Sequence, residues 1–343
     1  MASPFNRRPI PDYFIASPLV ALLYPVHQIL LRLRGPPRLP PPGTQPIRVV
    51  CISDTHTLEW PDVPDGDLLI HAGDLCNDGS ARDIQAAVDW LRSLPHPYKV
   101  AIGGNHDSYF DVRSRLDEDR KGPASTGDSF SAVSSSTASI HSLHDLNGAS
   151  RIDWAPARAP SPFTARRKSQ PSSPFGPEHA FTYPPHHDAW SGTVPPETDI
   201  LVTHTPPQSH LDLSPVYSTG CPNLLAESWR VRPALHVFGH VHESAGQEPI
   251  FWDEAQRAWE RLCASRRSRA RLSRLASLAG FLRDLFDLSA WMDAARVVGY
   301  GILGVVWAHV WGGENLNGGW MVNAACMYRD TGRLGNPPRV FTL

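Results

Sequence analysis

Five clusters of Asp, His and Asn residues carry the side chains that could do chemistry in this sequence. They read Ser53-Asp54-Thr55-His56, His71-Ala72-Gly73-Asp74, Gly103-Gly104-Asn105-His106-Asp107, Thr203-His204-Thr205 and Gly239-His240-Val241-His242. Carboxylate, amide and imidazole donors without cysteine suit Mn²⁺, Fe, Zn²⁺ or Mg²⁺ rather than thiophilic ions. The candidate metal ligands are Asp54, His56, Asp74, Asn105, His204, His240 and His242, which are too many for one ion. Two divalent metal ions about 3.5–4 Å apart would use all of them and would form the clamp that in-line phosphoryl displacement needs.

The pairs Asp54-x-His56 and His240-x-His242 place two ligands at alternate positions. Alternate residues of an extended segment point the same way, so we expect extended backbone there, with both side chains of each pair directed at the site. His71 and His236 lie inside apolar runs. We expect these two to be hydrogen-bonded core residues rather than ligands.

Each cluster follows a short apolar run that predicts a buried strand. The runs are 48–52, 68–70, 99–102, 200–202 and 235–238, and later strands are expected within 321–326 and 339–342. Between the second and third runs, Ser80 is placed to cap a helix that ends near Leu94, before Pro95. Ligands of α/β sheets bind beyond the carboxyl ends of the strands. We therefore expect the five clusters to converge on one site.

Composition restricts the classes of protein to consider. The 343 residues are 41% hydrophobic and 19% charged, and their 34 prolines argue against an all-helical bundle. A formal net charge of −2 supplies no basic field for nucleic acid, so none is expected as a partner. The five cysteines show no C-x-x-C spacing, which argues against a disulfide scaffold and a thiolate zinc site and favours a reducing compartment. We expect a cytoplasmic protein.

The predicted organisation is an N-terminal apolar helix with a Pro-rich linker at 1–46, then one catalytic domain at 47–343. This domain carries two insertions. Residues 111–197 are rich in Ser, Pro, Arg and Gly and predict a long loop or disorder with little core. Residues 251–311 predict helices with a basic face, followed by an apolar stretch interrupted by glycines. The basic face would consist of Arg261, Arg266, Arg267, Arg269, Arg271 and Arg274.

The N-terminal apolar stretch at 14–33 is long enough to cross a membrane but is interrupted by Pro18, Pro25 and Arg32, among others. No small-residue cleavage pattern follows it, which argues against a cleaved signal peptide. We expect a helix docked on the domain. The alternative is peripheral contact with an intracellular membrane through 14–33 and 297–311.

Taken in order, the five clusters resemble the calcineurin-like metallophosphoesterase superfamily, with its D-x-H, G-D, G-N-H-D, lone His and G-H-x-H motifs. The flanking sequence, such as "GDLLIHAGDL" and "RPALHVFGHVHE", is most similar to the metallophosphoesterase-domain-containing branch of this superfamily. Relatives of that branch include class III cyclic nucleotide phosphodiesterases. The similarity covers roughly 47–110 and 197–246, and a weaker similarity is found at 320–343. The resemblance implies an α/β fold, a four-layer α/β/β/α sandwich of two mixed sheets flanked by helices.

The resemblance also implies roles for the candidate ligands. Asp54, His56 and His242 would hold one metal, Asn105, His204 and His240 would hold the other, and Asp74 would bridge them. His106, which is not a ligand in this family, would act as the general acid on the leaving oxygen or stabilise charge on the phosphoryl group. Asp107 is expected to assist by orienting the His106 ring.

The expected activity is hydrolysis of a small phosphodiester or phosphomonoester by in-line attack of a metal-bridging hydroxide. Two departures from the family pattern favour reduced activity: Thr205 stands where relatives have Gly, and 111–197 lacks an apolar strand pair at the sheet edge. The alternative is therefore a catalytically weak or inactive, metal-stabilised scaffold associated with membranes. The sequence leaves the native metals, the substrate and the oligomeric state open.

Overall fold

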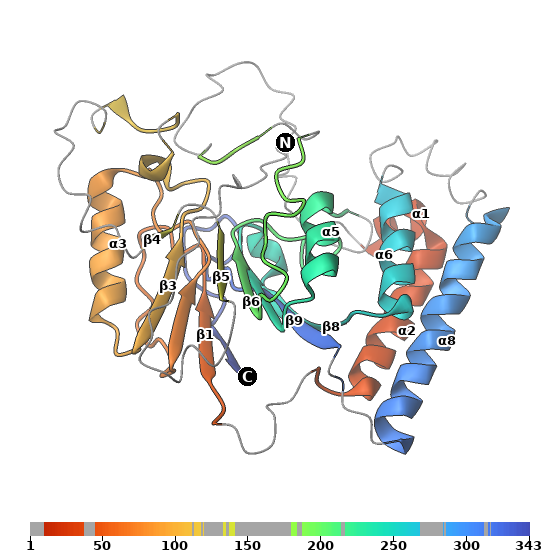
Figure 1. Ribbon diagram of the computed structural model, residues 1–343. Coiled ribbons are helices and arrows are strands. Elements are labelled where there is room, and N and C mark those ends of the chain that lie inside the picture. The colour runs from red at the N-terminus through yellow and green to blue at the C-terminus, as the bar shows by residue number, and fades with distance from the viewer. Residues whose placement is uncertain are drawn as a thin grey trace.

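Two mixed five-stranded sheets form the centre of the computed structural model (Figure 1). The structure describes residues 10–37, 45–111, 113–117, 119, 133–134, 137–140, 180–183, 187–213, 217–267, 284, 286–311, 315 and 317–343. The first sheet has the order β10 (Arg339–Thr342), β1 (Arg48–Ile52), β2 (Leu68–His71), β3 (Tyr98–Ile102) and β4 (Val133–Ser134). The second has the order β5 (Thr137–Ile140), β6 (Ile200–Thr203), β7 (Leu235–Phe238), β9 (Gly318–Asn323) and β8 (Gly246–Phe251). Edge strands β10, β5 and β8 pair antiparallel, and the other neighbours pair parallel.

The two sheets pack face to face, because alternate residues of each strand point to opposite sides. In β1, Val49 and Cys51 belong to the core between the sheets, whereas Val50 and Ile52 belong to the core under helix α3 (Ala81–Ser93). Helix α5 (Pro222–Val231) covers the outer face of the second sheet. Two mixed sheets flanked by helices confirm the predicted fold class.

The predicted cap of α3 is present. The Ser80 hydroxyl accepts a hydrogen bond from the Asp83 backbone N–H at 3.1 Å, and the helix ends at Ser93 with Leu94 in extended conformation. Helix α3 buries Ile84, Val88 and Leu91. This helix fixes the spacing between β2 and β3, whose following loops carry two of the five clusters.

The N-terminal apolar stretch forms helices that pack on the second predicted insertion. Helices α1 (Ile10–Ala16), α2 (Pro18–Arg34), α6 (Glu254–Arg267) and α8 (Leu288–Val310) share one core, which includes Val20, Leu262 and Val297. We call these four helices the helical unit, and Figure 1 shows it at one edge of the molecule. The expected docked helix is thus present, and it contacts the 251–311 segment. The domain boundary after residue 46 stays a prediction.

The apolar stretch at 297–311 is helical as far as Val310, and its glycines lie within α8 without interrupting the helix. The helix continues through Gly299, Gly301 and Gly304. A Cβ added at Gly301 would lie 2.7 Å from Leu30, and one at Gly304 would lie 2.9 Å from Arg34. These glycines therefore allow α2 to approach α8 closely, and the packing offsets their low helix propensity.

The prediction that Arg266 belongs to an exposed basic face of 251–311 is wrong. Its side chain is 2% exposed and pairs with buried Asp284 at 2.9 Å, because a buried cation needs a partner. Arg261 pairs with Asp293 at 2.9 Å, so its charge is also matched. The side chain of Arg267 and residues Arg269, Arg271 and Arg274 lie outside the described residues.

The prediction for 111–197 is wrong in two respects. Its Ser-rich centre contains β4 and β5, which extend one edge of each sheet through pairing with β3 and β6. Cross-strand backbone hydrogen bonds do not require apolar side chains, so the pattern of apolar residues missed these strands. The end of the segment also contributes core: Trp190 is 1% exposed and donates a hydrogen bond from Nε1 to the Tyr183 hydroxyl at 2.7 Å. Residues 120–132 and 141–179 lie outside the described residues.

Among the described residues, no helix is both long and apolar enough to cross a membrane.

Glu227 of α5 should stabilise the fold in a pH-dependent way. Its buried carboxylate accepts hydrogen bonds from the backbone N–H groups of Gly192 and Val194, at 3.1 and 2.9 Å, and pairs with Arg230 at 2.7 Å. Burial alone would raise the pKa of Glu227, but Arg230 and the amide donors lower it. We expect Glu227→Gln to reduce the free energy of unfolding by about 1–3 kcal/mol at neutral pH.

Because the folded-state pKa of Glu227 is depressed, its contribution is complete above the unfolded value of about 4.3 and is lost as the pH falls below it. The difference in the free energy of unfolding between wild type and Glu227→Gln should therefore shrink when denaturant titrations are repeated at acid pH. Asp89→Asn, which removes an exposed ion pair with Arg92, is the matched control and should change little. A difference that stays constant down to acid pH would contradict the prediction.

Candidate metal centre

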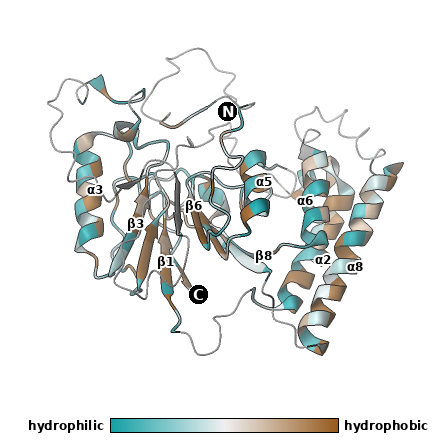
Figure 2. Ribbon diagram, viewed as in Figure 1, coloured by the Kyte–Doolittle hydropathy of each residue, from teal (hydrophilic) through white to brown (hydrophobic). Residues whose placement is uncertain are grey.

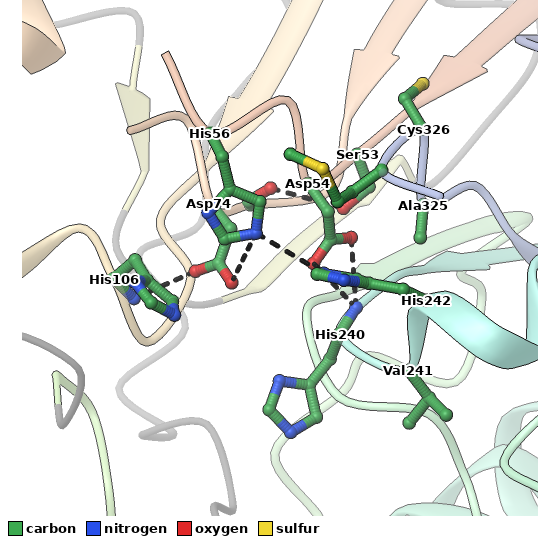
Figure 3. Close-up of polar contacts among 12 residues, drawn as sticks. Ser53, Asp54, His56, Asp74, His106, His240, Val241, His242, Ala325 and Cys326 are labelled. Carbon is green, nitrogen blue, oxygen red and sulfur yellow. Dashed lines mark hydrogen bonds and ion pairs between the residues drawn. The ribbon is translucent and has the colours of Figure 1, made fainter. Parts of the chain in front are cut away.

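The five predicted clusters come together in the loops that follow β1, β2, β3, β6 and β7. Figure 3 shows the side chains of Asp54, His56, Asp74 and His242 facing one another. One group comprises Asp54, His56 and His242. The His242 Nε2 atom lies 3.3 Å from Asp54 Oδ1 and 3.3 Å from His56 Nε2. Two imidazole nitrogens and a carboxylate oxygen thus point at one position, as ligands of a cation would.

A second group comprises Asp74, His204 and His240, with Asn105 beside it. The His204 Nε2 atom lies 3.0 Å from Asn105 Oδ1 and 3.3 Å from Asp74 Oδ2. The same Asp74 oxygen lies 3.8 Å from His56 Nε2 of the first group. Asp74 therefore stands between the two groups.

Backbone carbonyls orient the histidine rings. The Nδ1 atom of His204 lies 2.9 Å from the Ala72 oxygen, and that of His242 lies 2.9 Å from the Arg329 oxygen. A carbonyl can only accept, so each Nδ1 carries the hydrogen and each Nε2 is directed at the centre. This arrangement is typical of metal-bound histidines.

The backbone at the site is left-handed at several residues, which corrects our expectation of extended pairs. Asp54, His56, Asp74 and His240 have φ angles of 52°, 48°, 53° and 68°. His242 opens a short 3₁₀ turn, His242–Ser244. The conformation is unfavourable for residues with a Cβ. Each pair thus reaches the site through tight turns rather than through the alternation of a strand.

Two glycines leave the room that the carboxylates occupy. A Cβ at Gly239 would lie 2.0 Å from Asp54 Oδ2, and a Cβ at Gly104 would lie 2.2 Å from Asp74 Oδ1. Real Cβ atoms do not approach so closely. The glycines of the G-N-H-D and G-H-x-H clusters are therefore required for close approach of the backbone to the ligands.

Electrostatics at the centre favour bound cations. Asp54 and Asp74 are 0% and 2% exposed. Burial opposes their ionisation, but the neighbouring histidines hold both pKa values below the usual range. Conversely, burial lowers the pKa of His204, yet Asp74 and Asp54 raise it to about 10. Two buried carboxylates demand positive charge, and the donor set of carboxylate, imidazole and amide oxygen fits divalent metal ions.

The predicted role of Asp107 is wrong. Its carboxylate is fully buried and accepts hydrogen bonds from the backbone N–H groups of Gly104, Leu75 and Cys76, at 2.7, 3.2 and 3.2 Å. Burial, followed by repulsion from Asp74, raises its pKa to about 6. Asp107 thus ties the loop after β3 to the loop after β2. The cluster GNHD could not reveal this, because its partners are backbone groups.

His106 lies at the edge of the centre and is half-buried. Its Nδ1 atom lies 2.8 Å from the Asn77 carbonyl oxygen, which takes the orienting role expected of Asp107. Its ring centroid lies 4.8 Å from that of His56, and its backbone N–H donates to Asp74 Oδ1 at 2.8 Å. His106 therefore faces the first ligand group from the side of the β3 loop.

Thr205 does not show the backbone crowding that its replacement of Gly suggested. It is not among the non-glycine residues with positive φ, and its carbonyl oxygen accepts a hydrogen bond from the Thr203 hydroxyl at 2.9 Å. The side chain is buried. The structure places Thr205 beside the second group without displacing His204.

His71 and His236 are core residues, as predicted. His71 Nε2 lies 2.9 Å from the Thr55 hydroxyl, and His236 Nε2 lies 2.9 Å from the Thr203 hydroxyl. Burial lowers the pKa of His71 to about 4 and that of His236 to about 3. Both rings are therefore neutral and structural.

Sequence reasoning missed Asn323, which supports the loop of His240 and His242. Its side-chain amide donates to the carbonyl oxygens of Val241 and Leu211, at 2.9 and 3.0 Å. Asn323 ends β9, so a polar residue at a strand end was the signal that could have found it.

Comparisons with known proteins agree with this geometry. The family model "Calcineurin-like phosphoesterase" matches residues 47–244, more than half of the chain. Among curated relatives, "Probable rhamnogalacturonate lyase C" of Emericella nidulans is 36% identical over 219 residues, which are 62% of this chain and 19% of that protein. "UPF0046 protein K07C11.7" of Caenorhabditis elegans is 34% identical over 60% of this chain and 67% of its own length.

"Metallophosphoesterase domain-containing protein 1" of Homo sapiens is 35% identical over 216 residues, which are 60% of this chain and 63% of that protein. The chain thus matches about a fifth of the fungal relative and less than two thirds of the human one. The family match includes all five ligand clusters. The chain belongs to the calcineurin-like phosphoesterase family.

Proposed function

We propose that this protein is a phosphoesterase that depends on two divalent metal ions and hydrolyses a phosphodiester or a phosphomonoester. The observation that carries the proposal is the position of Asp74. One of its oxygens lies 3.3 Å from His204 and 3.8 Å from His56, so a single carboxylate serves both ligand groups. A carboxylate shared in this way is the bridge that a two-metal site needs.

The two groups of side chains would divide the ligands between the two ions. Asp54, His56 and His242 would hold one ion, and Asn105, His204 and His240 would hold the other. Oxygen and imidazole donors accept Mn²⁺, Fe, Zn²⁺ or Mg²⁺. When bound, the two ions supply an activated water nucleophile and neutralise charge on the phosphoryl group.

His106 would move a proton at its Nε2 atom. Because Nδ1 holds its hydrogen against the Asn77 carbonyl, Nε2 is the atom that can exchange a proton with a substrate. An imidazole suits this role near neutral pH. The protonated ring would donate to the leaving oxygen.

A second candidate is an inactive, metal-stabilised scaffold. The exposed apolar surface of α2 and α8 favours a role in attachment. The two candidates differ in turnover rather than in metal content, so the following experiments separate them.

Metal removal and replacement of the bridge should abolish hydrolysis. The chelator-treated chain should not hydrolyse bis-p-nitrophenyl phosphate, and Mn²⁺, Fe²⁺, Mg²⁺ or Zn²⁺ should restore the reaction. Asp74→Asn should lower the rate at least about a thousandfold, because metal ions supply several kcal/mol of transition-state stabilisation. Metal analysis should find two ions per chain in wild type and fewer in Asp74→Asn.

Asp89→Asn removes a carboxylate from the exposed face of α3 and is the control, with wild-type rate and metal content. A wild-type chain that binds two metal ions but hydrolyses no phosphoester with any of the four metals would support the scaffold instead.

If His106 is the general acid, the loss of rate in His106→Ala should depend on whether the leaving group needs a proton. p-Nitrophenolate departs without protonation, so the loss on bis-p-nitrophenyl phosphate should be small. On a phosphodiester with an alkyl leaving group, the loss in kcat should reach roughly 10²–10⁴-fold. Metal content should stay at two ions per chain.

Equal losses on both substrates, or loss of an ion from His106→Ala, would overturn this role. The latter result would instead make His106 a ligand of the group that it forms with His56 and Asp74.

A further inference from the structure

Helix α2 exposes one stripe of large apolar side chains. Leu22, Val26, Ile29 and Leu33 recur at helical spacing and are 63%, 39%, 53% and 54% exposed. A helix on the surface of a soluble protein normally turns such a stripe to the core. Here the stripe faces away from the helical unit's own core, which is filled by Leu19, Val20 and Leu23 and by residues of α6 and α8.

In helix α8, small residues face the protein and large apolar residues face outward, which is the reverse of an ordinary surface helix. The side that packs on the helical unit carries mostly small residues. They are Ala290, Ala294, Val297, Gly301 and Gly304. The large apolar residues are exposed, and they are Leu288, Trp291, Met292, Tyr300, Ile302, Leu303, Trp307 and Val310, followed by Trp311. Helices in lipid pack through small residues and turn large apolar ones to the acyl chains.

The two exposed surfaces adjoin. Leu30 of α2 meets Gly301 of α8, and the ring of His309 contacts the Leu33 carbonyl oxygen at 2.5 Å. Figure 2 shows both helices at the outer edge of the molecule with strongly hydrophobic stretches. We call the exposed apolar residues of α2 and α8 the outer apolar face.

The charges on these helices complement an anionic surface. Helix α2 contains no acidic residue and exposes Arg32. The single acidic residue of α8, Asp293, is 15% exposed and is paired with Arg261 and Arg296, whose side chains are 41% and 43% exposed. Asp293 is thus neutralised, and Arg261 is matched by Asp293 and Glu254. Arg32 and Arg296 remain accessible to anionic headgroups.

Aromatic side chains on this surface also suit a lipid interface. Trp307 and Trp311 stack with centroids 6.4 Å apart and are 52% and 65% exposed. Trp and Tyr prefer the boundary between headgroups and acyl chains, because their rings are apolar with one polar atom.

We propose that the outer apolar face attaches this protein to the surface of a membrane containing anionic phospholipids. Because the inner sides of α2 and α8 pack on α6, only their outer sides can enter the lipid. The helices would therefore lie in the plane of the membrane surface. The attachment is independent of the proposed hydrolysis.

Flotation of the full chain with vesicles tests the attachment without an activity measurement. Wild type should float with vesicles of phosphatidylcholine and phosphatidylserine, and more weakly with phosphatidylcholine alone. Leu303→Glu, on α8, should lower the partition coefficient at least about tenfold, because it removes an apolar side chain and adds a like charge to the headgroups. Ile29→Glu, on α2, should act in the same direction.

Leu58→Glu is the matched control, since Leu58 is 38% exposed in the loop after β1, away from the outer apolar face. It should float like wild type, and thermal unfolding should show that all variants are folded.

Failure of wild type to float, or equal losses in Leu303→Glu and Leu58→Glu, would overturn the proposal. A dimer in solution that Leu303→Glu converts to a monomer would also overturn it, since a second copy of the chain would then cover the face. If phosphatidylserine does not increase the amount of chain that floats, attachment to anionic phospholipids through the arginines is wrong.

Discussion

The burial of two carboxylates, Asp54 and Asp74, is the constraint on which the centre depends. Neither is more than 2% exposed, and both are ionised beside histidines. Ionised groups at such depth require compensating charge and hydrogen-bond donors. The protein supplies part of this from backbone N–H groups, since His240 donates to Asp54 at 3.0 Å and His106 donates to Asp74 at 2.8 Å. Tight turns with positive φ and glycines without a Cβ are what bring those amides to the carboxylates.

The two-sheet architecture meets this constraint because parallel strands end at one edge. β1, β2 and β3 deliver three clusters, and β6 and β7 of the second sheet deliver the other two. The sheets themselves need only an apolar core. The loops are then held by groups outside the candidate ligand set: Asp107 joins two loops of the first sheet, and Asn323 supports the G-H-x-H loop of the second. The precision of the site therefore depends on residues outside the ligand set.

Sequence reasoning predicted the five strands that precede the clusters, the cap at Ser80 and the convergence of the clusters, because each depends on short-range pattern or on residue chemistry. It failed where backbone groups or neighbouring elements decide the structure. Asp107 looks like a partner for His106, yet three backbone amides bind it. Strand β4 lies in Ser-rich sequence, and an existing strand edge is what makes it a strand. Arg266 looks like a surface cation, but Asp284, 18 residues further along the chain, pairs with it in the interior.

The helical unit is fixed to the loops of the centre rather than tethered by a linker alone. His210, in the loop that continues from His204, lies 2.7 Å from Glu248 of β8 and 3.0 Å from Glu260 of α6. Burial lowers the pKa of His210, but the two glutamates raise it to about 10, so the ring is positively charged and pairs with both. Arg34 of α2 also pairs with Asp253, which precedes α6. The buried cluster of His210 with its two glutamates resists rearrangement, because separating any member leaves an uncompensated charge. If the outer apolar face lies on a membrane, the metal centre is then presented at a set orientation to that surface, and substrate access depends on geometry as well as on diffusion.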